Sequence, residues 1–275
     1  MSPMIEFRDV SFSIDDRPIL TRVSFNVERG QTRVILGPSG SGKSTILRLL
    51  IGLWRPDSGS IVVDGEDITQ VTPERMREVR KRMGMVFQQG ALFDSMTVGE
   101  NIGYTLLEDG HDEVEIEEAV RTYLLQVGLD PALADRMPDE LSGGMQRRVA
   151  IARALAARNP DVLLYDEPTT GLDPQSAERI TDLIVQLRDT MGKTSIMVTH
   201  DIADAFKVGN RVTVLDRGMV VFEGTPAELT EASNAFIGEF LAPFRKAVAA
   251  ASRRMDTRGL GVGGPGPQHQ PGGNP

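Results

Sequence analysis

The first thirty residues alternate between apolar and polar positions. Apolar residues recur from Ile5 to Ile14 and again from Ile19 to Val27. A period of two predicts β-strands, and the sequence DDRP at residues 15–18 predicts a turn between them. We therefore expect two antiparallel strands near the N-terminus.

Shorter apolar runs predict further strands, and helical spacing predicts the segments between them. The expected strands are residues 33–36, 59–65, 84–87, 162–165, 195–199, 212–215 and 220–222. The expected helices are residues 44–50, 73–82, 98–107, 114–127, 142–157 and 175–191. Alternating strands and helices are typical of an α/β domain. The pattern predicts an α/β core with an N-terminal antiparallel β-subdomain and an inserted α-helical subdomain at residues 90–157.

The sequence changes character twice after the core. Residues 233–255 carry an apolar stripe at helical spacing, made of Phe236, Ile237, Phe240, Leu241, Phe244 and Val248. We interpret the stripe as a docking face rather than a ligand site, and Pro243 is expected to start, kink or divide the helix. Residues 256–275 are rich in Gly and Pro and are expected to be disordered. The predicted organisation is one domain over residues 1–232, a helical extension and a tail.

Composition narrows the class of protein. The 275 residues are 40% hydrophobic and 25% charged, as in ordinary globular proteins. No run approaches the ~20 apolar residues of a membrane-spanning helix, and no secretory signal is evident. The sequence has no cysteine, which excludes disulfides and thiolate metal sites and fits a cytoplasmic location. A net charge of −9 argues against a nucleic-acid partner.

Residues 37–45, of sequence GPSGSGKST, fit the phosphate-binding loop pattern GxxxxGK[ST]. An expected strand precedes this loop and an expected helix follows it, which is the context that the pattern requires. Backbone N–H groups and the helix N-terminus suit a phosphate chain. Lys43 would reach the β- and γ-phosphates, and the Ser44 hydroxyl would ligate Mg²⁺. The candidate nucleotide-binding residues are Gly37, Pro38, Ser39, Gly40, Ser41, Gly42, Lys43, Ser44 and Thr45.

Two carboxylates follow the expected strand at residues 162–165. Asp166 suits a Mg²⁺ ligand beside Ser44. Glu167 points elsewhere and could polarise an attacking water. Taken alone, the pair could also be two exposed acids that cap a turn.

A third motif narrows the family. The sequence LSGGMQ at residues 141–146 begins a helix and resembles the signature motif of ABC-transporter ATPases. Other segments resemble further elements of that family in the same order. These are Phe87-Gln88 for the Q-loop, residues 170–173 (TGLD) for the D-loop, and residues 198–201 (VTHD) for the switch histidine. The resemblance covers about residues 4–230.

The resemblance implies a P-loop ATPase with the ABC fold and assigns roles to single residues. The phosphate loop, with Ser44, Gln88 and Asp166, would hold Mg²⁺ and ATP, and Lys43 and Gln88 would assist catalysis. Glu167 would be the general base, and His200 would contact the γ-phosphate. Ser142, Gly143 and Gly144 would contact ATP held by a second copy, and Asp173 would belong to the same nucleotide site. The active unit would therefore be a homodimer.

The family also implies membrane partners. A separate permease would bind the ATPase at the cytoplasmic face of the membrane. The run Gly90–Phe93 and Met145 resemble the ATPases of Mla/Mce-type phospholipid transport, which would add an Mce-domain protein and a small regulatory subunit. The alternatives are the ATPase of a polar-solute importer and a non-transport ABC ATPase that gates a membrane partner.

One position departs from the family pattern and yields a prediction. The family often stacks adenine on an aromatic ring near residue 14, where this chain has Ile14. We expect a weaker or purely apolar contact with the base and modest base selectivity. Turnover of ATP and GTP by the purified chain should therefore be comparable, whereas strict dependence on ATP would contradict this interpretation.

Overall fold

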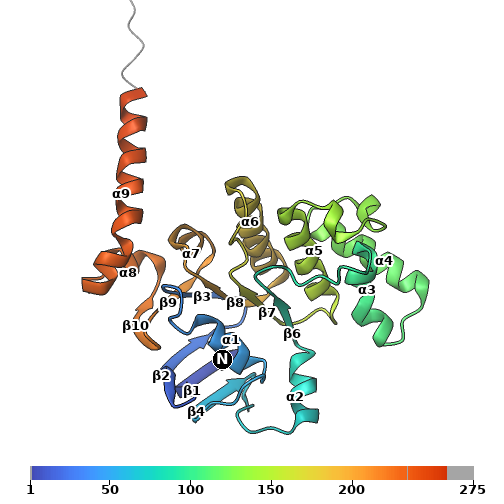
Figure 1. Ribbon diagram of the computed structural model, residues 1–275, viewed down its shortest axis with the longest axis horizontal. Helices are drawn as coiled ribbons and strands as arrows, with labels where there is room; N and C mark the ends of the chain where they lie inside the picture. Colours follow the sequence, from blue (N-terminus) through green and yellow to red (C-terminus); the bar gives the residue numbers. More distant parts are fainter. Residues whose placement is uncertain (1, 234, 259–275) are drawn as a thin grey trace, which may run out of the picture. The chain divides into compact units, whose positions relative to one another are not determined.

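The computed structural model describes residues 2–233 and 235–258 (Figure 1). The chain divides into two units, with the boundary between Glu231 and Ala232. Within the described residues, no helix is long and apolar enough to cross a membrane.

A six-stranded sheet forms the centre of the first unit, in the order β10-β9-β3-β8-β7-β6. Its strands are β3 (Thr32–Leu36), β6 (Met83–Val86), β7 (Val162–Asp166), β8 (Thr194–Thr199), β9 (Arg211–Asp216) and β10 (Met219–Gly224). Strands β9, β3, β8, β7 and β6 pair in parallel in that order, and β10 pairs antiparallel with β9. All five residues of β3 are buried, which explains why its apolar residues Val34, Ile35 and Leu36 follow one another without alternating with polar ones.

A second, antiparallel sheet has the order β2-β1-β4-β5. It contains β1 (Ile5–Ile14), β2 (Arg17–Val27), β4 (Ser58–Val63) and β5 (Glu66–Asp67). Ile14 pairs with Arg17, so the expected hairpin is confirmed. Asp15 and Asp16 form its two-residue loop with φ of 47° and 59°, a conformation that Asp tolerates better than most residues.

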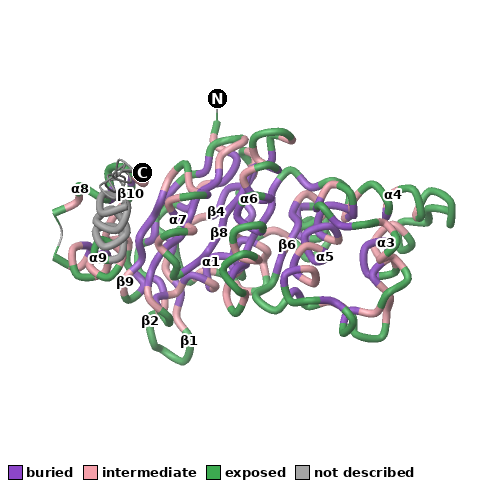
Figure 2. The backbone as a smooth tube through the Cα atoms, turned by 90° about the horizontal axis from the view of Figure 1, so that it is seen from above, coloured by how far each residue is buried: buried purple, intermediate pink, exposed green. Residues whose placement is uncertain are grey.

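Helix α1 (Lys43–Leu50) lies between the two sheets (Figure 1). Ile46, Leu47 and Leu50 are fully buried in one apolar core with side chains from both sheets, including Phe7 and Ile196. Figure 2 shows this burial along the central strands and the exposed loops around them. The core therefore fixes α1 to the ends of β3 and β7.

The inserted subdomain is helical, as expected. It contains α3 (Val98–Glu108), α4 (Glu113–Gln126), the 3₁₀ turns Pro131–Leu133 and Pro138–Glu140, and α5 (Gly143–Ala156). Capping boxes begin α3 at Thr97 and α4 at Asp112. Helix α3 packs against both α4 and α5.

Four other helices complete the first unit: α2 (Pro73–Arg80), α6 (Pro174–Met191), α7 (Ile202–Val208) and α8 (Pro226–Glu231). The sequence patterns did not predict α7 or α8. The second unit contains α9 (Ala235–Arg258), in which the rings of Phe236 and Phe240 stack with centroids 5.8 Å apart.

Helix α9 runs through Pro243, so a start or division there is wrong. Proline removes one backbone donor, and the helix continues on both sides of it. Most of the expected disordered tail, residues 259–275, lies outside the described residues.

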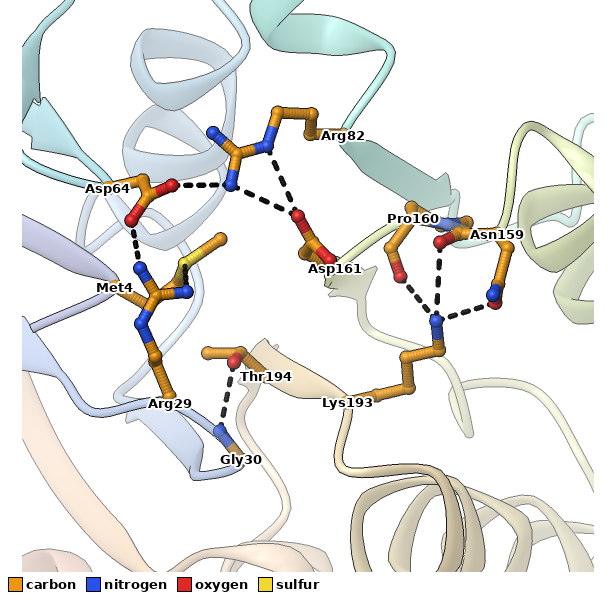
Figure 3. A network of polar contacts seen from close by, with 10 residues as sticks. All are labelled: Met4, Arg29, Gly30, Asp64, Arg82, Asn159, Pro160, Asp161, Lys193 and Thr194. Atoms are coloured by element: carbon orange, nitrogen blue, oxygen red, sulfur yellow. Dashed lines mark hydrogen bonds and ion pairs between the residues drawn. The ribbon is translucent and has the colours of Figure 1, made fainter.

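A polar network fastens the amino ends of the parallel strands (Figure 3). Arg82, just before β6, donates to Asp64 at 2.7 Å and to Asp161 at 3.0 Å. Lys193, just before β8, donates to the Asn159 side chain and to the Pro160 carbonyl, both at 2.7 Å. The carboxyl ends of the strands lie at the opposite edge of the sheet, which is where α/β proteins bind ligands.

Candidate active site

The phosphate loop is folded around the side chain of Lys43. The Lys43 ammonium donates to the carbonyls of Gly37 and Pro38, each at 3.0 Å, and the residue is only 6% exposed. Gly42 has φ of 101°, and a Cβ there would lie 2.7 Å from the Leu20 side chain. Glycine is therefore required both by the backbone conformation and by the hairpin that packs against the loop.

Ser44 and Asp166 meet at the ends of α1 and β7. The Ser44 hydroxyl donates to Asp166 Oδ1 at 2.8 Å. Burial raises the pKa of Asp166, while the hydrogen bond from Ser44 opposes that shift. A hydroxyl and a single carboxylate fit Mg²⁺, which is usually bound by one or two carboxylates together with phosphate and water. The loop also holds the buried Ser41 hydroxyl, which has no hydrogen-bond partner among the described residues.

Glu167 is buried and its carboxylate has three neighbours. His200 Nδ1 lies 2.7 Å from Glu167 Oε2, and the Thr170 hydroxyl donates to the same oxygen at 2.9 Å. Lys43 Nζ lies 3.6 Å from Oε1. Burial lowers the pKa of Lys43, and the carboxylate of Glu167 opposes that shift. The structure therefore brings Lys43 and His200 together beside the carboxylate of Glu167.

The backbone of Glu167 is unusual. Its φ is 49°, in the left-handed region that few non-glycine residues occupy. The Glu167 N–H donates to the Val198 carbonyl at 2.9 Å, and the Glu167 carbonyl accepts from Arg147 Nη1 at 3.2 Å. Such conformations persist where the surroundings fix them, and they cluster at functional sites.

The side chain of Gln88 lies apart from this cluster in the described residues. Gln88 is exposed, and no side-chain hydrogen bond joins it to Ser44 or Asp166 in the part of the chain that the structure describes. Its carbonyl instead accepts a hydrogen bond from Arg147.

The glycine-rich start of α5 lies on the surface beside α6. Ser142 is exposed and caps α5 by accepting from the Met145 N–H at 3.3 Å; the adjacent Gly143 is also exposed. Gly144 is buried, and a Cβ there would lie 2.7 Å from the Ser176 hydroxyl. Asp173 caps α6 by accepting from the Ser176 N–H at 3.0 Å, and hydrogen bonds from Ser176 lower the pKa of Asp173.

The expected base-binding position is also accessible. Ile14 is 41% exposed, whereas Phe12 is buried and stacks on Trp54 with ring centroids 5.2 Å apart. Phe12 is therefore committed to the core, and Ile14 is the exposed apolar side chain at the end of the hairpin.

Sequence reasoning missed Arg147 and the Thr170 hydroxyl as neighbours of Glu167. An arginine in a helix usually faces solvent, so no local pattern indicates that Arg147 is buried. Thr170 lies three residues after Glu167, and that spacing predicts a turn contact only once Glu167 is known to be buried.

Comparison with known families identifies the chain. The sequence profile of the family described as ABC transporter matches residues 20–170. The chain belongs to the ABC-transporter ATPase family. This ABC ATPase binds and hydrolyses ATP, and the predicted fold is confirmed.

Three similar proteins illustrate the match. The intermembrane phospholipid transport system ATP-binding protein MlaF of Haemophilus influenzae is 39% identical over 239 residues, covering 86% of this chain and 90% of that protein. The methionine import ATP-binding protein MetN of Caulobacter vibrioides is 42% identical over 228 residues, covering 82% of this chain and 68% of that protein. The ATP-binding cassette MJ0796, solved as a dimer in a post-hydrolysis state with ADP and Pi, has 34% identity and a TM-score of 0.74 and covers 81% of this chain and 99% of that one.

The geometry around Glu167 yields a prediction for the ABC ATPase. Glu167→Gln keeps a side chain of the same size but cannot accept a proton. Loss of a general base typically costs about 10²- to 10⁴-fold in rate. We therefore expect kcat to fall by at least about 10²-fold, with ATP binding retained and the ATP-bound dimer trapped.

The matched control is Glu118→Gln, an exposed acid on α4. Steady-state kinetics gives kcat, binding of a fluorescent ATP analogue gives the affinity for nucleotide, and light scattering shows whether the dimer is trapped. Turnover at the wild-type level in Glu167→Gln would show that Glu167 is not the base.

Proposed function

We propose that this ABC ATPase powers phospholipid transport through a separate membrane permease. The observation that carries the proposal is the extent of the match to MlaF, which spans 90% of that protein. The match to MetN is 42% identical but leaves about a third of MetN unmatched, since it covers 68% of that protein. The larger matched share of MlaF than of MetN favours the lipid system. A polar-solute importer stays the second candidate because of the identity to MetN.

The site residues would have separate roles in ATP hydrolysis. The phosphate loop and Lys43 would bind the β- and γ-phosphates, and Ser44 and Asp166 would hold Mg²⁺, with Gln88 as a further candidate ligand. Mg²⁺ would neutralise charge on the transferred phosphoryl group. Glu167 would accept a proton from the attacking water, while Lys43 and His200 would turn from its carboxylate toward the γ-phosphate. Positioning and charge neutralisation supply most of the rate enhancement in this chemistry.

A second copy of the chain would complete each site. The exposed Ser142 and Gly143 and the capped start of α5 offer N–H groups to an anion. No contact joins them to Lys43 or Glu167 in the described part of the chain. Ser142 to Gly144 and Asp173 would therefore contact ATP held by the partner copy. The dimeric state of MJ0796, which has 34% identity, supports this arrangement.

An apolar groove on the helical side would receive the permease. The groove has a volume of ≈ 310 Å³ and is lined by residues of β6, α3, α5 and the loop after β6. Phe87 and Phe93 are 41% and 42% exposed at it. Buried Asn101 holds the loop by hydrogen bonds to both the N–H and the carbonyl of Phe93, at 2.8 and 3.1 Å. An apolar helix of the permease is the occupant that such a fixed, apolar groove would suit.

Further partners follow from the proposed lipid function. An Mce-domain protein would deliver lipid, and the apolar stripe of residues 233–255 would contact the second copy or a small regulatory subunit. The ATPase would then lie at the cytoplasmic face of the membrane, held there by the permease.

Purification from native membranes tests the proposal. We expect the tagged chain, extracted in mild detergent, to bring a permease, an Mce-domain protein and phospholipid, as identified by mass spectrometry. A permease that instead recruits a soluble solute-binding protein would support the polar-solute importer and contradict the lipid assignment.

A substitution in the groove tests where the permease docks. Phe93→Lys places a second cation beside Arg153, whose guanidinium lies 5.5 Å from the centre of the Phe93 ring. It should lower recovery of the permease at least about tenfold, because a charge that is buried without a counter-charge costs several kcal/mol. Leu125→Lys is the matched variant on α4, where the leucine is 58% exposed, and should leave recovery unchanged. Equal recovery with both variants would contradict permease docking at the groove.

A further inference from the structure

Arg147 is a buried cation that pairs with carbonyl groups instead of a carboxylate. The residue is 5% exposed, and burial lowers the pKa of its guanidinium. No carboxylate forms an ion pair with it in the described part of the chain. The buried Arg33 differs, because its Nη1 lies 2.8 Å from the Glu223 carboxylate. A buried cation without a counter-charge is costly, so the carbonyl groups that accept its hydrogen bonds are what hold the guanidinium in place.

The guanidinium of Arg147 joins two segments that are distant in sequence. Its Nη1 donates to the Glu167 carbonyl at 3.2 Å, and its Nη2 donates to the Gln88 carbonyl. Gln88 lies in the loop that follows β6 and lines the groove at Phe87 and Phe93, and Glu167 follows β7. Arg147 itself lies on α5, four residues after Gly143, the first residue of that helix. One side chain therefore connects the signature helix, the Q-loop and the candidate base.

The contact to Glu167 acts on a strained peptide. Glu167 has φ of 49°, and its N–H is already held by the Val198 carbonyl. On the other side, the Glu167 carbonyl accepts hydrogen bonds from Arg147 Nη1 and from the Thr170 N–H, each at 3.2 Å. With both peptide groups held, the carboxylate is directed toward Thr170 and His200. Loss of Arg147 removes one of the two donors to this carbonyl, so the left-handed conformation of Glu167 is held less firmly.

Neighbouring arginines of α5 show what is particular to Arg147. Arg148 donates to the Gly128 carbonyl at 2.8 Å, within the helical subdomain. Arg153 donates to the carbonyls of Gly90 and Ala91, at 3.0 and 2.8 Å, and thereby holds the same loop farther along. Of these three arginines, Arg147 is the one that also reaches Glu167.

We propose that Arg147 is a positioning residue for ATP hydrolysis, which couples the Q-loop and helix α5 to the orientation of Glu167. The inference rests on the proposed role of Glu167 as the base. A displacement of the loop by a permease at the groove, or of α5 by the partner's nucleotide, would be passed through the guanidinium to the Glu167 peptide. Lysine cannot substitute fully, because it offers a point charge in place of a planar fork.

Arg147→Met and Arg147→Lys in the full chain, purified with its membrane partners, test the proposal. Hydrogen bonds from a charged donor are worth enough to expect a fall in kcat of about 10- to 100-fold for Arg147→Met. KM for ATP should change less than about threefold, because the phosphate loop is untouched. Arg147→Lys should recover part of kcat. Arg148→Met, the matched neighbour, should keep kcat within about twofold.

Three results would overturn the proposal. The first is a kcat within twofold of wild type in Arg147→Met, and the second is full recovery of kcat in Arg147→Lys. The third is a fall in kcat that is accompanied by an equal fall in ATP affinity or by a lower melting temperature, because Arg147 would then have a merely structural role. Glu167→Gln is measured alongside. Normal turnover in Glu167→Gln defeats the base assignment, whereas a slow Glu167→Gln with a normal Arg147→Met defeats this inference alone.

Discussion

The buried ammonium of Lys43 is the group around which the site is organised. A buried charge is tolerated only when it is paired or hydrogen-bonded. Here the pairing requires the phosphate loop to curl so that two of its carbonyls face Lys43, and it requires the Glu167 carboxylate to approach from the end of β7. The loop, α1 and β7 therefore have to be placed together, and the apolar core around α1 does this.

The two edges of the central sheet serve different purposes. At the amino ends, Arg82 joins Asp64 and Asp161 and so links β6 and β7 to the smaller sheet. At the carboxyl ends, the polar groups are those of the site, with Ser44 bonded to Asp166. Because these contacts hold the amino ends of the strands together, the loops at the carboxyl ends can bind and release a ligand. Helix α5 reaches this edge from the inserted subdomain through Arg147.

The parts of the fold that could be predicted from the sequence have either a strong hydrophobic period or a motif that requires a particular backbone conformation. Strand β3 is a run of buried residues, and the glycines at residues 37–42 demand a turn. Helix α7 went unpredicted because it has only seven residues, which is too short for a helical period to stand out in the sequence. The guanidinium of Arg147 donates to the carbonyls of Gln88 and Glu167, which are distant from it in sequence. A local sequence pattern does not indicate which distant carbonyls lie beside a helix.

We propose that a second copy of the chain completes each site, and the chain's lack of cysteine allows a direct test by oxidative cross-linking. Ser39→Cys places one thiol in the phosphate loop, and Ser142→Cys places one at the signature motif. With a non-hydrolysable ATP analogue and a mild oxidant, a mixture of the two variants should give a disulfide-linked dimer on a non-reducing gel, while neither variant alone should. A mixture that stays monomeric would contradict the claim.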